Sequence, residues 1–151
     1  MPHSVLRSAA TIAVLAMHAA SSSAGGTSAL PALAASLDNL TVSGVSAGGY
    51  AAVQFQFAHA TLVRGAGVIA AGPYYCAEGS TWHALTRCMS PSSWSPLPSP
   101  AHLRANAEVF AASGQNDPVD SLRDDRVWLL SGGRDAVVKT SVVEQLAALY
   151  G

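Results

Sequence analysis

The sequence predicts an α/β fold in which helices flank a parallel sheet. Three short runs of apolar and β-branched residues have the length and composition of strands, and segments with apolar residues at three- and four-residue spacing accompany them. Strands that alternate with helices favour a parallel sheet, because parallel neighbours need a crossover connection. Half of the 151 residues are apolar and 11% are charged, which is typical of one folded domain with a buried core.

The first strand and helix are expected on either side of a sharp, glycine-rich turn. The run "LTVSG" at residues 40–44 is short and β-branched, as a strand should be. From Ala47 onward, Tyr50, Val53 and Phe57 are spaced three or four residues apart, which predicts a helix with one apolar face. The expected order is therefore strand, turn, helix.

A second strand is expected over residues 65–73, where "GAGVIAAGP" is a continuous run of small and apolar residues. Such a run is typical of a strand that a parallel sheet buries on both faces. Residues 74–100 are then rich in Ser, Pro and aromatics, which predicts a long surface excursion without a regular element. Loops of this kind carry function more often than packing.

The last three elements are a helix, a strand and a helix. Residues 101–113 have helical spacing, and Gly114 follows as a stop signal. The run "RVWLLSG" at residues 126–132 predicts a third buried strand, and the segment after it repeats apolar residues at helical spacing up to Leu149.

Residues 1–24 are expected to be a secretory signal. A basic Arg7 precedes an apolar run over residues 9–20, and small residues with Ser22 and Ala24 follow where a signal peptidase would cut. The alternatives are a short buried helix or an N-terminal anchor, but the run is shorter than the ~20 residues that a spanning helix needs. We expect a secreted protein, extracellular or periplasmic, with no membrane span.

Charge and cysteine content narrow the classes of partner. The net charge is -1, and no run of Lys or Arg provides a footprint for nucleic acid.

Cys76 and Cys88 are the only cysteines, and in an exported chain an even count favours a disulfide. Two buried thiols or half of a metal site are the alternatives. No paired Cys or His spacing supports a metal, and no cofactor is expected.

The turn after the first strand reads Gly44-Val45-Ser46-Ala47-Gly48, a Gly-x-Ser-x-Gly motif between a strand and a helix. In that setting the serine takes a strained backbone conformation that lifts its hydroxyl above the sheet, and a Cβ at either flanking glycine is expected to clash. Ser46 is the candidate nucleophile, and the N–H of Ala47 is expected to form one half of an oxyanion hole. The alternative is a glycine-rich turn capped by serine.

A serine nucleophile needs a histidine base and a carboxylate that fixes the histidine tautomer. Asp135 follows the third strand at the carboxyl edge of the sheet, so it is the candidate acid, although a turn or N-cap aspartate would also suit this position. All five histidines precede Asp135. His59 lies ~20 Å from Ser46 along the expected helix. His83 and His102 stay open as bases, although structural or solvated roles suit them better. The triad is therefore expected to lack its base in this chain.

Three blocks of the sequence resemble the secreted polyhydroxybutyrate depolymerases. "LDNLTVSGVSAGGYAAVQFQFAHA" is similar to the nucleophile segment of that family, "VRGAGVIAAGPYYCAEGS" to the strand and aromatic-cysteine loop after it, and "RVWLLSGGRDAVV" to the acid segment. The resemblance covers roughly residues 30–150. It implies a circularly permuted α/β-hydrolase fold, so residues 25–151 are expected to form part of such a catalytic domain.

The resemblance carries the family's roles onto Ser46 as nucleophile, Ala47 as oxyanion donor and Asp135 as acid. The family's histidine and second oxyanion donor lie after the acid helix, so the chain is expected to be truncated before the catalytic histidine. A group of aromatic residues near the sheet edge is expected to contact the apolar polyester, the alternative being core or loop packing around the cysteines: Tyr74, Tyr75 and Trp82.

The function that follows is a secreted serine esterase that hydrolyses poly(3-hydroxybutyrate)-type polyesters or small esters through an acyl-enzyme on Ser46. A general carboxylesterase or lipase is the first alternative, because the serine motif does not report the length of the acyl chain. A truncated, non-catalytic remnant that keeps the sheet is the second.

Overall fold

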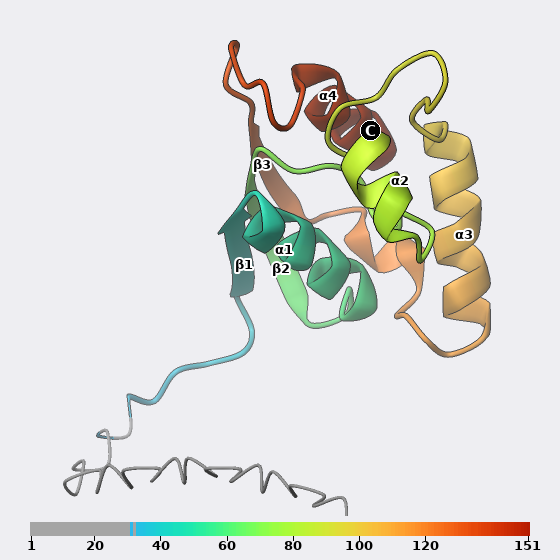
Figure 1. Cartoon of the computed structure of the whole chain (residues 1–151). Coiled ribbons are helices and arrows are strands. Elements are labelled where there is room, and N and C mark those ends of the chain that lie inside the picture. Colours follow the sequence, from blue (N-terminus) through green and yellow to red (C-terminus); the bar gives the residue numbers. More distant parts are fainter. Residues whose placement is uncertain (1–30, 32) are drawn as a thin grey trace, which may run out of the picture. The chain divides into compact units, whose positions relative to one another are not determined.

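The computed structural model describes Pro31 and residues 33–151, with residues 34–151 in one compact unit (Figure 1). The signal predicted over residues 1–24 lies outside the described residues. The strands are β1 (Leu40–Val45), β2 (Val63–Ile69) and β3 (Arg126–Leu130), and the helices are α1 (Ala47–Ala58), α2 (Thr81–Thr86), α3 (Pro100–Ala112), the 3-10 turn η1 (Val119–Leu122) and α4 (Thr140–Tyr150). In the part of the chain that the structure describes, no helix is long and apolar enough to cross a membrane.

The three strands form one parallel sheet in the order β1-β2-β3. Ala66 at the centre of β2 pairs with Val42 on one side and with Val127 on the other. Because all strands run the same way, their carboxyl ends meet at one edge, where the turn after β1 and the loop after β3 both lie. The predicted α/β class and parallel sheet are confirmed.

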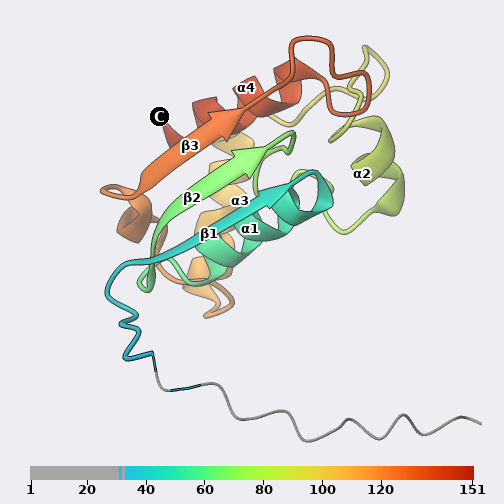
Figure 2. The same ribbon diagram turned by 90° about the vertical axis from the view of Figure 1, so that its left-hand side faces the viewer.

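One face of the sheet carries the hydrophobic core. Figure 2 shows α1, α3 and α4 together behind the strands. Val53 and Phe57 of α1, Leu103 of α3 and Leu146 of α4 are buried in one cluster with Val68 of β2. The apolar spacing that predicted these helices is therefore the spacing of the residues that pack on the sheet.

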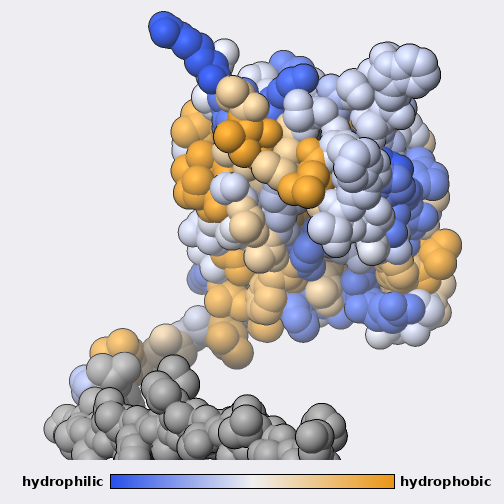
Figure 3. Space-filling model, viewed as in Figure 1, coloured by the Kyte–Doolittle hydropathy of each residue, from blue (hydrophilic) through white to orange (hydrophobic). Residues whose placement is uncertain are grey.

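The opposite face of the sheet has no helix over it among the described residues (Figure 2). Val45 is 59% exposed, Trp128 57% and Leu130 46%, one side chain from β1 and two from β3. Figure 3 shows hydrophobic surface gathered along this side of the molecule. Residues 65–69 of β2 are nevertheless buried or half-buried, as predicted, although the described residues place a helix layer on one face only.

The excursion after β2 is more regular than expected. Ser80 begins α2 by accepting a hydrogen bond from the N–H of His83 on its side-chain oxygen, and Ser99 begins α3 in the same way. Gly114, with φ 73°, ends α3. The prediction of an excursion without any regular element is wrong at α2, a short helix with no buried residue whose periodicity gives little signal.

Candidate active site

Ser46 occupies the sharp turn between β1 and α1. Its φ of 54° and ψ of -123° are outside the regions that a residue with a side chain normally adopts. The Ser46 N–H donates to the carbonyl oxygen of Ile69 at 2.9 Å, and the Ser46 carbonyl accepts from the N–H of Tyr50 at 3.0 Å. Strand β2 and helix α1 therefore hold the strained backbone that the sequence predicts for this serine.

The glycines around Ser46 differ in how much room their surroundings leave for a side chain. A Cβ on Gly44 would lie 2.1 Å from the carbonyl oxygen of Gly48, and a Cβ on Gly49 would lie 2.8 Å from the Cβ of Ala71. At Gly48 itself, a Cβ would meet nothing within 4 Å. The expected clash is present at Gly44 but not at Gly48, because the exposed first turn of α1 turns that position away from the strand.

Ala47 is the first residue of α1 and is exposed. The first N–H groups of a helix have no intrahelical acceptor, and the helix dipole adds partial positive charge there. The backbone of Ala47 is therefore placed to donate to a negatively charged oxygen formed beside Ser46.

Asp135 lies in the loop after β3 and shapes that loop. Its Oδ1 accepts hydrogen bonds from the N–H groups of Val137 at 2.8 Å and Val138 at 3.0 Å, and its own N–H donates to the carbonyl of Gly132 at 3.0 Å. The described residues bring no hydrogen-bond donor to its second oxygen, Oδ2. Asp135 therefore stabilises the turn after β3, which is the alternative role given for it above. Its Oδ2 is free to accept a hydrogen bond from a group outside the described residues.

Of the three histidines in the described residues, two have partners other than Ser46 and Asp135. His59 caps the end of α1, and its ring lies 4.5 Å from the Phe55 ring in a tilted arrangement, while the Nε2 of His102 lies 2.6 Å from the Oε1 of Glu78. His83 sits on α2, and its buried Nδ1 has no hydrogen-bond partner. Neither Ser46 nor Asp135 is hydrogen-bonded to a histidine within the described range.

A cavity of about 600 Å³ opens beside Ser46. One wall is the exposed side of α1, with Ser46, Tyr50 and Gln54 on successive turns. The opposite wall is the excursion after β2, including Met89, and Val138 from the Asp135 loop completes it. Ser46 and the loop that carries Asp135 therefore border the same cavity, whose lining is mostly carbon.

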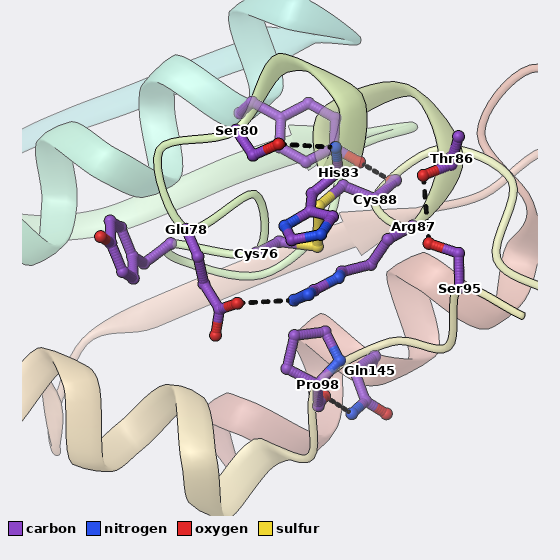
Figure 4. The surroundings of a disulfide bond; sticks show 12 residues. Cys76, Glu78, Ser80, His83, Thr86, Arg87, Cys88, Ser95, Pro98 and Gln145 are labelled. Carbon is purple, nitrogen blue, oxygen red and sulfur yellow. Dashed lines mark hydrogen bonds and ion pairs between the residues drawn. A yellow bond between two sulfur atoms is a disulfide. The ribbon is translucent and has the colours of Figure 1, made fainter.

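A disulfide between Cys76 and Cys88 ties the excursion together (Figure 4). The Cα atoms are 5.8 Å apart, and both residues line the cavity. Arg87 donates to Glu78 at 2.8 Å across the same loop. The predicted disulfide is confirmed, and the cavity wall that it supports is cross-linked instead of being a free loop.

Tyr50 joins α1 to this wall. Its hydroxyl donates a hydrogen bond to the carbonyl oxygen of Cys88. Burial raises the pKa of Tyr50 from 10.0 to about 12, although a hydrogen bond with the backbone of Gly72 opposes the shift. Tyr50 therefore stays protonated and keeps donating at any ordinary pH.

The aromatic residues predicted to bind substrate occupy three different places. Tyr74 is 6% exposed, stacks on Phe57 at 4.6 Å and accepts a hydrogen bond from Asn116 at 2.8 Å. It is a core residue outside the cavity lining, so the substrate-contact prediction is corrected for Tyr74. Tyr75 lines the cavity, whereas Trp82 is 70% exposed on α2 and does not line it.

Sequence reasoning missed Gln54, Met89 and Val138 as cavity residues. The spacing of Gln54 from the nucleophile, two helical turns, is a signal that could have found it. Met89 and Val138 reach the cavity through loops, for which the sequence offers no comparable periodicity.

No family model matches the chain. The sequence is 44% identical over 122 residues to the poly(3-hydroxybutyrate) depolymerase of Delftia acidovorans, a match that covers 80% of this chain and 24% of the relative. It is 33% identical over 124 residues to the polyhydroxybutyrate depolymerase of Talaromyces funiculosus, covering 82% of this chain and 34% of the relative. The chain is a homologue of the polyhydroxybutyrate depolymerases. It spans about a quarter to a third of the length of these two relatives.

Solved structures agree with this relationship. The PHB depolymerase from Penicillium funiculosum matches with a TM-score of 0.66 and 30% identity, over 82% of this chain and 37% of that one. A serine-to-alanine variant of a PHB depolymerase, complexed with an R3HB trimer, matches with a TM-score of 0.67 at the same identity and coverage. The depolymerase homologue thus has part of an α/β-hydrolase-like fold. The circular permutation stays a prediction.

Proposed function

We propose that this homologue provides the nucleophile and acid of a serine esterase that cleaves poly(3-hydroxybutyrate)-type polyesters. The observation that carries the proposal is Ser46 at φ 54° between β1 and α1, beside an apolar cavity that the Asp135 loop also borders. The names of the sequence and structural relatives supply the substrate class.

In the proposed reaction, the Ser46 Oγ attacks the carbonyl carbon of the ester while its proton passes to a histidine. The carbonyl oxygen becomes an oxyanion, which the Ala47 N–H stabilises at the start of α1. The ester C–O bond breaks, and the leaving alkoxide takes the proton from the histidine. Water, deprotonated by the same histidine, then releases the acyl group from Ser46.

The proposal assigns the base to a histidine other than the five in this sequence. The free Oδ2 of Asp135 is available to accept from the Nδ1–H of that histidine, while Oδ1 keeps the loop in shape. Without the base, nucleophile and acid lose most of the contribution of a triad, commonly on the order of 10⁴-fold. We therefore expect little turnover from the 151 residues alone.

The surroundings of the cavity suit an apolar polyester more than a charged substrate. Tyr75 and the disulfide offer apolar contacts in the cavity, and we propose that Trp82, which is exposed on α2 outside the cavity, contacts a longer chain. Among the described residues that line the cavity, Glu78 is the only charged one, and Arg87 and His102 pair with it.

We also propose secretion, extracellular or periplasmic. Residues 1–24 have the basic, apolar and small-residue segments of a secretory signal, and residues 25–151 then belong to the catalytic domain. The Cys76–Cys88 disulfide supports this location, because disulfides persist in oxidising compartments. Mass spectrometry of the protein from the culture medium tests it, with cleavage near Ala24 as the expected result.

The activity is best tested in a chimera in which this chain replaces the matched residues of the Delftia relative. We expect the chimera to clear poly(3-hydroxybutyrate) suspensions and to lose this activity on Ser46→Ala. Asp135→Asn keeps the Oδ1 acceptor but removes the charge, and it should lower the rate at least 10³-fold. Activity that is indifferent to Ser46→Ala would remove Ser46 from the mechanism.

The chain by itself provides the complementary test. Hydrolysis of a short p-nitrophenyl ester should be slow and should differ little between the unmodified chain and Ser46→Ala. Fast, Ser46-dependent hydrolysis would show that a histidine of this chain, such as His83, reaches the nucleophile. A chimera that folds but is inactive would favour the alternative of a non-catalytic remnant.

A further inference from the structure

The cavity beside Ser46 contains one polar side chain that neither the fold nor the proposed chemistry uses fully. Gln54 lies on α1 two turns after Ser46 and lines the same cavity. Its Oε1 accepts a long hydrogen bond from the N–H of Tyr75, at 3.4 Å. Nothing in the described part of the chain accepts a hydrogen bond from its Nε2.

The other polar groups of the lining already have partners or a role. The Tyr50 hydroxyl donates to Cys88, and the Glu78 carboxylate pairs with Arg87 and His102. Gln54 thus offers its two amide hydrogens to whatever fills the cavity. An unpaired donor at a mostly apolar wall is complementary to a ligand that brings an isolated acceptor.

A polyester chain brings such acceptors at regular intervals. Its ester carbonyls accept hydrogen bonds, and it has no donor along its length. Residues 46 and 54 are separated by eight positions, or about 12 Å along the helix axis. That separation exceeds one 3-hydroxybutyrate unit, but helical side chains tilt toward the N-terminus of their helix, so Gln54 reaches back toward the repeat unit next to an ester that reacts at Ser46.

We propose that Gln54 is a specificity-determining residue whose Nε2 donates a hydrogen bond to a second ester carbonyl, in the repeat unit next to the one attacked. The inference rests on the proposed function of Ser46. It assigns to this chain a preference for oligomeric 3-hydroxyalkanoate esters over esters with a single carbonyl.

Binding measurements test the assignment without requiring turnover. The full chain carrying Ser46→Ala is titrated by calorimetry with two ligands, methyl (R)-3-hydroxybutyrate and the methyl ester of the (R)-3-hydroxybutyrate trimer. Adding Gln54→Met removes the donor with an unbranched side chain of similar size, and adding Gln54→Glu replaces it by an acceptor. Gln115→Glu, at an exposed glutamine after α3 that is outside the cavity lining, is the matched control.

We expect tighter binding of the trimer than of the monomer, and about tenfold weaker trimer binding with either Gln54 substitution, as for one lost hydrogen bond. Monomer binding should change less than twofold, and Gln115→Glu should change neither. Far-ultraviolet circular dichroism confirms that each variant is folded. Equal losses for both ligands, or no loss at all, would overturn the assignment.

The experiments distinguish a failure of the Gln54 role from a failure of the proposed reaction. A trimer that does not bind, beside a chimera whose hydrolysis needs Ser46, would overturn the role of Gln54 and leave the nucleophile in place. Gln54-dependent trimer binding beside a chimera that is indifferent to Ser46→Ala would overturn the proposed reaction. In that case the inference, which rests on Ser46, would fail with it.

Discussion

The carbonyl oxygen of Gly48 lies 2.1 Å from the point where a Cβ on Gly44 would stand. This close approach is a consequence of the turn at Ser46, which folds the first turn of α1 back over the end of β1. The two glycines of the serine motif therefore have different structural roles. Gly44 makes room for the backbone at residue 48, and Gly48 carries no matching restriction from its surroundings.

We predict that Gly44→Ala destabilises the protein by about 3 kcal/mol or more, or prevents folding, because backbone must move to relieve the overlap. Gly48→Ala should be close to neutral or slightly stabilising, since alanine favours a helix over glycine. Urea unfolding followed by circular dichroism compares the two. Similar losses of unfolding free energy would contradict this division of roles.

Removing the disulfide should cost about 3 kcal/mol of unfolding free energy, the value expected for a closed loop of this size. The pair to test is Cys76→Ala with Cys88→Ala, measured against the oxidised protein in urea without reductant. The reduced unmodified chain is the control, because it keeps both side chains. We also expect the loop around Met89 to exchange its amide hydrogens faster, since the disulfide braces that wall of the cavity.

The order of strands and helices could be predicted from the sequence because its signals are local. Val53 and Phe57, for example, recur at helical spacing because both pack on the same face of the sheet. The uncovered face of the sheet could not be predicted. A run of small apolar residues such as β2 indicates burial without saying how many layers provide it.

The residues of the candidate site could also be predicted only in part. Ser46 and its strained turn follow from a motif with a fixed local geometry. Tyr74 and Tyr75 are neighbours of the same residue type, yet one packs in the core and the other faces the cavity. Tyr75 has a positive φ of 51°, a conformation that is uncommon for a residue with a side chain and that the sequence of this run does not predict.

Two substitutions of Asp135 separate its role as a hydrogen-bond acceptor in the turn from the effect of its charge. We predict that Asp135→Ala lowers the unfolding free energy by about 1 kcal/mol, because the N–H groups of Val137 and Val138 lose their acceptor. Asp135→Asn keeps a carbonyl oxygen at Oδ1 and should stay within about 0.5 kcal/mol of the unmodified chain. Equal destabilisation by both would mean that the charge, and not the acceptor, holds the loop.

The uncovered face of the sheet should limit solubility, since exposed apolar strand surface promotes association. We predict that Leu130→Thr raises the soluble concentration and lowers the fluorescence of bound ANS, with a change in unfolding free energy below about 0.5 kcal/mol. Leu129→Thr, whose side chain packs against the core on the other face, is the matched control and should cost about 2 kcal/mol. A gain in solubility from both, or from neither, would contradict the assignment of faces.

Because burial raises the pKa of Tyr50, the free energy of unfolding should fall at alkaline pH. Below pH 10 the hydroxyl is protonated in both the folded and the unfolded chain, so its ionisation does not affect folding. Between the unfolded pKa of 10.0 and the folded pKa of about 12, the unfolded chain loses the proton first, and stability falls as pH rises. Phenylalanine cannot ionise, so Tyr50→Phe removes this part of the alkaline loss.

The variant also loses the hydrogen bond to the Cys88 carbonyl, which should cost about 1 kcal/mol at pH 8. We therefore expect Tyr50→Phe to be the less stable protein at pH 8 and the difference to shrink above pH 10. Tyr150, whose pKa burial also raises, remains in both proteins and keeps a residual alkaline loss in each. Urea unfolding at pH 8, 10 and 11.5 measures the difference, and a gap that stays constant across this range would show that Tyr50 ionises as readily in the folded protein as in the unfolded chain.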